Sequence, residues 1–201
     1  AIASFFIARR YLGTQIFGRA YTALGFAYLS VFFAEVTYLV YDLFLGLDPY
    51  PSIADVFFFA LYPLTLVHLI LNIRFFNVKS NVLTKIWMVA IPIGILTIYS
   101  IFAFEEIGEA NFDFYYGMIF IAGASATLVF AILGAKIFRE GILGVAWLLL
   151  VIGILGLTIG DVWYYYLETF GEYDLQHPVN LFWYAGYWII VYALIKHKNI
   201  I

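Results

Sequence analysis

Six long apolar stretches constrain this sequence more than any other feature. Each is long enough to cross about 30 Å of hydrocarbon as a helix, which takes about 20 residues, and a helix satisfies its own backbone hydrogen bonds in lipid. Of the 201 residues, 65% are apolar and only 11% are charged. The sequence therefore predicts an all-α, polytopic transmembrane helical bundle, with residues 1–201 as a single transmembrane domain. Spans are expected at about residues 20–41, 53–73, 86–104, 114–135, 142–167 and 179–195.

Residues 1–8 are also apolar, but they are too short to cross a membrane. They lead directly into Arg9 and Arg10, the reverse of the order in a signal peptide, where basic residues precede the apolar core. We therefore expect a partial N-terminal helix, the end of a span that begins upstream in the natural chain.

Charged residues are segregated between the two sets of helix ends. The ten Lys and Arg residues fall in the connections after even-numbered spans, before the first span or after the last. Apart from Glu140, the 13 acidic residues fall at the opposite ends. Short loops rich in Lys and Arg stay in the cytoplasm. The sequence therefore predicts a multi-pass protein of the cell membrane with a cytoplasmic C-terminus and an acidic outer face.

The sequence also contains an internal repeat at an offset of 126 residues. This offset aligns Lys136 with Arg10, and it aligns Trp147 with Tyr21. Because four predicted spans separate the two copies, both copies have the same orientation, and the repeat is parallel with a unit of four helices. The repeat halves are expected at about residues 10–135 and 136–201, the second being incomplete.

Acidic residues inside the predicted spans mark the candidate site. In the first copy Glu35, Tyr38 and Asp42 follow one another at helical spacing, and the offset places Asp161, Tyr164 and Glu168 at matching positions. A carboxylate within a span is costly unless it is paired. We therefore expect two related polar clusters that face the bundle interior and either lock helix pairs together or bind a ligand or cation. The partners expected from the opposing helices are Asp55 and Tyr62 for the first cluster, and Asn180 and Tyr187 for the second.

Two polar residues also have simpler structural interpretations. Ser52 or Asp55 can cap the helix that begins near residue 53, and this is the preferred interpretation of Asp55. His68 lies deep in the second span, and the other histidines are expected at opposite faces of the membrane, so a hydrogen-bonded structural role is preferred over a ligand role. The chain has no cysteine, which excludes disulfides, thiolate metal sites and cysteine nucleophiles. Because it also has no serine or threonine in a nucleophile motif and no histidine cluster, the sequence predicts no metal site, no cofactor and no catalytic residue. It also contains no nucleic-acid-binding motif.

One motif resembles a known membrane module. Gly160, Asp161 and Tyr164, an aromatic loop, and then Asn180, Trp183 and Tyr187 resemble the N-terminal multi-helix sensor module of bacterial and archaeal histidine kinases and diguanylate cyclases. The chain is also similar to uncharacterised archaeal polytopic membrane proteins. A weaker likeness, through residues 35–42 and 67–69, is to lysoplasmalogenase-type membrane proteins.

These resemblances and the residues together predict a non-catalytic integral membrane module, which is either a sensor or an accessory subunit of a larger assembly. Its expected partners are the lipid bilayer and either other membrane subunits or a signalling domain. The alternatives are a membrane lipid hydrolase, in which a carboxylate pair acts on lipid, and a small-molecule or cation transporter, which kinked helices and intramembrane acids would also suit.

Overall fold

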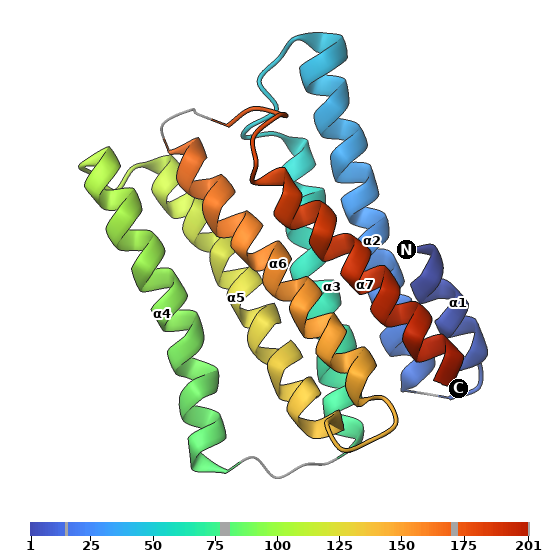
Figure 1. Ribbon diagram of the computed structural model, residues 1–201. Helices are drawn as coiled ribbons and strands as arrows, with labels where there is room; N and C mark the ends of the chain where they lie inside the picture. The colour runs from blue at the N-terminus through green and yellow to red at the C-terminus, as the bar shows by residue number, and fades with distance from the viewer. Residues whose placement is uncertain (15, 77–80, 170–172, 201) are drawn as a thin grey trace. The chain divides into compact units, whose positions relative to one another are not determined.

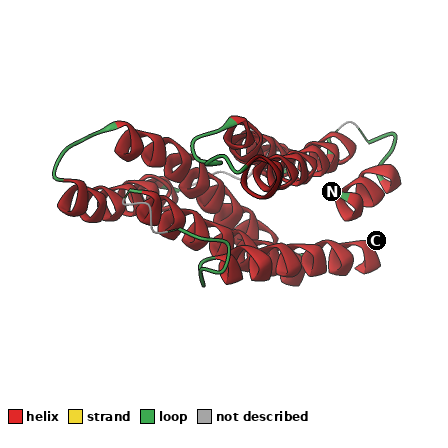
Figure 2. Ribbon diagram, turned by 90° about the horizontal axis from the view of Figure 1, so that it is seen from above, coloured by secondary structure: helices red, strands yellow, loops and turns green. Residues whose placement is uncertain are grey.

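Helices account for nearly all the regular structure of the chain in the computed structural model, which describes residues 1–14, 16–76, 81–169 and 173–200. Figure 2 shows helices joined by loops, with no strand in the described ranges. Five helices are long and apolar enough to cross a membrane among the described residues, and they match the first five predicted spans. The predicted all-α, membrane-type fold is therefore confirmed.

The chain divides into two units, residues 1–76 and 77–201. In the first unit a short helix, α1 (Ile2–Arg10), precedes α2 (Phe17–Leu39), and α3 (Ile53–Phe75) returns alongside α2. The structure therefore has a short helix at the N-terminal apolar stretch, where the sequence predicts one. The division between the units falls in the connection after α3, whereas the repeat predicts a division near residue 135.

Helix α2 continues beyond its predicted end as a π-helical segment, η1 (Val40–Leu45), whose hydrogen bonds join residues five apart instead of four. Gly46 ends this segment in the left-handed conformation, with φ +61°. The wider turn alters the angular spacing of side chains after residue 39. Asp42 is therefore rotated somewhat from the position that uninterrupted α-helical spacing from Glu35 predicts.

The described part of the second unit contains four helices, α4 (Val82–Ile107), α5 (Phe112–Phe138), α6 (Gly144–Glu168) and α7 (Asn180–Ile200). Figure 1 shows α4, α5 and α6 side by side, with α7 against α6. The side-chain amide oxygens of Asn81 and Asn111 cap the N-termini of α4 and α5. At the opposite end of α5 the Lys136 ammonium donates to the Thr84 hydroxyl across 3.0 Å and so ties α5 to α4.

Glycine allows α6 and α7 to approach closely. Gly153, Gly156 and Gly160 lie one turn apart on the face of α6 that meets α7, and a Cβ atom at Gly156 would lie 3.3 Å from the Phe182 carbonyl oxygen. Small residues at such an interface bring helix backbones into van der Waals contact. The glycines of α6 therefore serve the contact between α6 and α7 within this chain.

Candidate functional site

A hydrogen bond between Asp161 and Trp183 joins the acidic ends of α6 and α7. The Trp183 indole Nε1 donates to Asp161 Oδ1 across 3.0 Å, and both side chains are half-buried. Gly160 makes this geometry possible, because a Cβ atom there would lie 2.5 Å from the indole nitrogen. Trp183 is not among the partners predicted for Asp161, so the structure adds a donor that helical spacing did not select.

Three aromatic rings pack around this hydrogen bond. The Tyr164 ring centroid lies 5.3 Å from Trp183 and 4.8 Å from Tyr173, and Tyr173 lies 6.3 Å from Trp183. All three pairs are edge-to-face, within the range at which rings are in direct contact. The rings therefore fill the space between them. We name Asp161, Tyr164, Tyr173, Asn180 and Trp183 the α6–α7 cluster.

Asn180 holds the connecting segment against the start of α7. Its side-chain oxygen accepts a hydrogen bond from the Tyr173 hydroxyl, and its Nδ2 donates to the carbonyl oxygens of Leu175 and His177, each across 3.1 Å. All the hydrogen-bonding atoms of the amide therefore have partners. Asn180 therefore fixes the geometry of residues 173–177 where they lead into α7.

The matching positions of the first unit have a different arrangement. Asp55 is buried and forms a capping box with Ser52: the Ser52 N–H donates to Asp55 Oδ2 across 2.7 Å, and the Ala54 N–H donates to the Ser52 hydroxyl across 3.1 Å. The preferred interpretation of Asp55 as a capping residue is confirmed. Because this carboxylate already serves α3, it does not act as a free acid beside Glu35.

Glu35 is exposed on α2, and within the described part of the first unit it makes no hydrogen bond or ion pair. Tyr38 and Asp42 are half-buried, and Tyr62 is buried on α3, with its ring 5.9 Å from Phe59. Tyr38 and Asp42 thus lie on the α2–η1 side of the α2–α3 hairpin, and Asp55 and Tyr62 lie on α3.

The remaining predicted residues, Glu168 and Tyr187, are half-buried on α6 and α7. Neither is part of the Asp161–Trp183 hydrogen bond. Tyr173 and Trp183 are the site residues that the predicted set omits. Their signal in the sequence was the aromatic enrichment at the acidic helix ends, which an interfacial belt explains equally well.

His68 joins α3 to α2 in the first unit. Its Nδ1 lies 3.1 Å from the Ala20 carbonyl oxygen, which makes Nδ1 the donor, and the ring packs edge-to-face on Tyr21 at 4.7 Å. Asn72 donates to the His68 carbonyl oxygen across 2.7 Å. The hydrogen-bonded, structural interpretation of His68 is confirmed.

The fold and the site define an α-helical protein with several helices suited to a membrane, whose acidic ends carry carboxylates set among aromatic rings. In the described ranges, no three His, Asp or Glu side chains lie close enough together to hold a metal ion. No family model, curated protein or solved structure matches the chain.

Proposed function

We propose that this chain is a non-catalytic integral membrane module, acting as a sensor or as an accessory subunit of a larger membrane assembly. Two of the predicted acids make structural hydrogen bonds. Asp161 accepts the indole N–H of Trp183, and Asp55 accepts the backbone N–H of Ser52 in the capping box of α3. Such acids stabilise helix ends and hairpins. This use of the carboxylates supports a scaffold more than a hydrolase.

The observation that best supports membership of a larger assembly is the exposure of Glu35 on α2. Its neighbours on the same helical face, Phe32, Val36 and Leu39, are exposed apolar side chains. A carboxylate among apolar side chains in a span needs a polar partner or a proton. A helix of another subunit that carries a hydrogen-bond donor would cover the apolar face and satisfy Glu35 at the same time.

We infer that α7 is a sixth crossing. Its 21 residues extend about 31 Å at 1.5 Å per residue, close to the thickness of the hydrocarbon core. Its mean hydropathy is lowered by Asn180 at one end, by Lys196, His197 and Lys198 at the other, and by several Trp and Tyr residues between them. The helix packs closely on α6 through glycines. With six crossings, the segregated charges place the C-terminus in the cytoplasm.

The internal repeat remains part of this proposal. The aligned residues Tyr21 and Trp147 each stack on a ring at the end of the preceding helix: Tyr21 on Tyr11 with centroids 5.9 Å apart, and Trp147 on Phe138 with centroids 4.4 Å apart. Likewise α1, α2 and α3 pack in sequence, as do α5, α6 and α7. The similar stacking of this one aligned pair and the similar order of helix packing support a duplicated unit.

The test compares the protein with its Glu35→Gln variant, each purified in mild detergent from its own membranes and analysed by native mass spectrometry. We expect a stoichiometric membrane partner with the natural chain, and loss of that partner with Glu35→Gln while the unfolding midpoint is unchanged. Asp48→Asn, an exposed acid in the α2–α3 connection, is the matched control and should retain the partner.

The identity of the partner separates the two forms of the proposal. A kinase or cyclase domain identifies a sensor, and another membrane subunit identifies an accessory role. A protein that is always isolated alone and that hydrolyses added lysolipid, or that moves a cation across vesicles, would instead assign the chain to the hydrolase or transporter class.

A further inference from the structure

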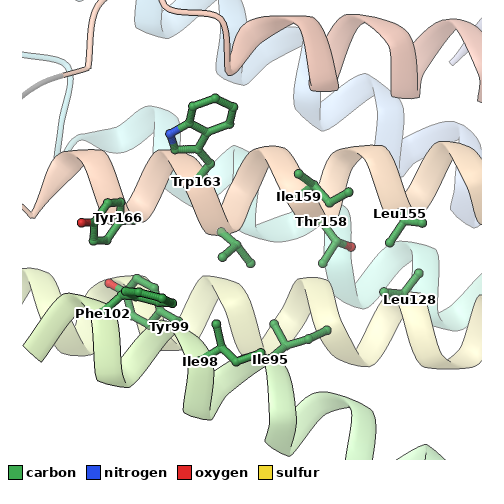
Figure 3. A pocket seen from close by; sticks show the side chains of 11 residues that line it. Ile95, Ile98, Tyr99, Phe102, Leu128, Leu155, Thr158, Ile159, Trp163 and Tyr166 are labelled. Atoms are coloured by element: carbon green, nitrogen blue, oxygen red, sulfur yellow. The ribbon is translucent and has the colours of Figure 1, made fainter.

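An apolar groove of about 550 Å³ lies between α4 and α6 in the second unit, with α5 as its floor. Figure 3 shows the rings of Phe102, Tyr99 and Tyr166 gathered at one end and the side chains of Leu128 and Leu155 at the other. The groove is lined almost entirely by carbon. An occupant must therefore be apolar over most of its length.

The length of the groove corresponds to one leaflet of a bilayer. Leu155 and Tyr166 line its two ends and lie 11 residues apart on α6, which is about 16 Å along the helix axis. Half of the hydrocarbon core is about 15 Å. A single lipid chain from the leaflet at the acidic helix ends would therefore lie along the groove from end to end.

The ring end of the groove carries negative charge. The Tyr166 hydroxyl donates to Glu106 Oε1 across 3.4 Å, and the Tyr166 ring meets Phe102 edge-to-face at 6.4 Å. Glu105 precedes Glu106 on α4, and Glu109 lies just beyond the end of this helix. The sequence has no Lys or Arg between Lys85 and Lys136. A carboxylate beside aromatic rings favours a cationic group at this end.

A buried hydroxyl lies near the same end. Tyr99 lines the groove and is only 1% exposed, and its ring reaches Gly117 on α5, where only a glycine leaves room for it. Its hydroxyl has no hydrogen-bond partner within the described residues. Buried polar groups of this kind normally have a partner. Because protein atoms already cover this hydroxyl, Tyr99 contributes its ring to the wall of the groove, and its hydroxyl does not contact an occupant.

We propose that this groove binds one membrane lipid, with a chain along α6 and an amine or quaternary ammonium headgroup at Glu106. The lipid site does not rest on the proposed sensor or accessory role.

The test uses nanodiscs that contain equal amounts of phosphatidylcholine and phosphatidylglycerol with identical acyl chains. The lipids that remain bound after extraction are counted by native mass spectrometry. We expect phosphatidylcholine to be retained about two- to fivefold over phosphatidylglycerol, as an exposed ionic contact allows. Glu106→Gln should abolish the preference, and Glu105→Gln, the adjacent acid, should keep most of it.

A second pair of variants tests the groove itself. Leu155→Trp places an indole in the groove and should reduce the number of retained lipids by one, whereas Leu148→Trp, at an exposed position of α6 outside the groove, should leave the number unchanged. Circular dichroism checks that each variant is folded. If Leu155→Trp does not fold, the Glu106→Gln comparison decides the question alone.

Three results would overturn the lipid site. The first is an unchanged headgroup preference in folded Glu106→Gln, and the second is an unchanged lipid count in folded Leu155→Trp. The third is a dimer of the natural chain that dissociates with Leu155→Trp while the lipid count stays the same, which would assign the groove to a second copy.

Discussion

The hydrogen bond between Trp183 and Asp161 should make a measurable contribution to the stability of the second unit. Trp183→Phe removes the indole donor and keeps an aromatic ring over Gly160, so the change isolates the donor better than truncation to alanine does. Its partner is a half-buried carboxylate 3.0 Å away. We expect the variant to unfold more easily than the natural chain.

Two estimates bracket the size of the effect. A hydrogen bond to a charged group contributes about 1.5–3 kcal/mol in soluble proteins, whereas hydrogen bonds between membrane helices average about 0.6 kcal/mol and reach about 1.7. The carboxylate lies near a helix end and is half-buried, so desolvation is incomplete and the lower estimate applies best. We expect a coupling of about 0.6–1.7 kcal/mol between the two side chains.

The coupling is measured by a double-mutant cycle of Trp183→Phe and Asp161→Ala, because the cycle cancels the packing that each change removes alone. Unfolding is followed by circular dichroism as the sodium dodecyl sulfate fraction of mixed micelles increases. Trp163→Phe is the matched control, since Trp163 lies on the same helix end and contacts His177 and Phe182 through its ring. A coupling below about 0.3 kcal/mol, or equal destabilisation by the control, would refute the interhelical lock.

Three further predictions concern helix ends, helix contact and topology. Asp55→Ala should destabilise the first unit by about 0.5–2 kcal/mol because α3 loses its capping box, as measured by the same unfolding assay. Gly160→Ala should destabilise by about 1–3 kcal/mol because its Cβ atom collides with an indole, whereas Gly94→Ala, which has open space, should be neutral or stabilising. Cysteines at Asp174 and Lys198 in this cysteine-free chain should react with an impermeant reagent from opposite sides of the membrane, and reaction from one side would contradict the topology.

The helices were predictable because the signal for a membrane helix is local and strong. Apolar length alone placed the first five spans, and the expected capping role of Asp55 followed from its position at the start of one of them. The π-helical segment at Val40–Leu45 was not predictable in this way. Its composition is as apolar as the helix before it, so neither hydropathy nor spacing distinguishes the wider turn.

The partner of Asp161 was not predictable because it depends on the relation between two helices. Spacing of i+3 or i+4 identifies neighbours along one helix, such as Tyr164. Which residue of α7 faces Asp161 depends on the rotation and axial shift of α7 against α6, and glycine contacts set both. The sequence identified Asn180 and Tyr187 as candidates, and the helix contact brings Trp183, between them, to the carboxylate.

The same reasoning explains why two aligned carboxylates have different environments. The proposed repeat would align Glu35 with Asp161. With one residue fewer in the second loop, the offset becomes 125 and would align Phe58 with Trp183. Phenylalanine has no hydrogen-bond donor, so the first hairpin does not repeat the lock of the second, and Glu35 remains exposed on α2. If the two hairpins descend from one unit, the second uses its acid to fix its own helices. The first then retains an acid that can meet a donor from another subunit, which is the contact on which the proposed membrane assembly depends.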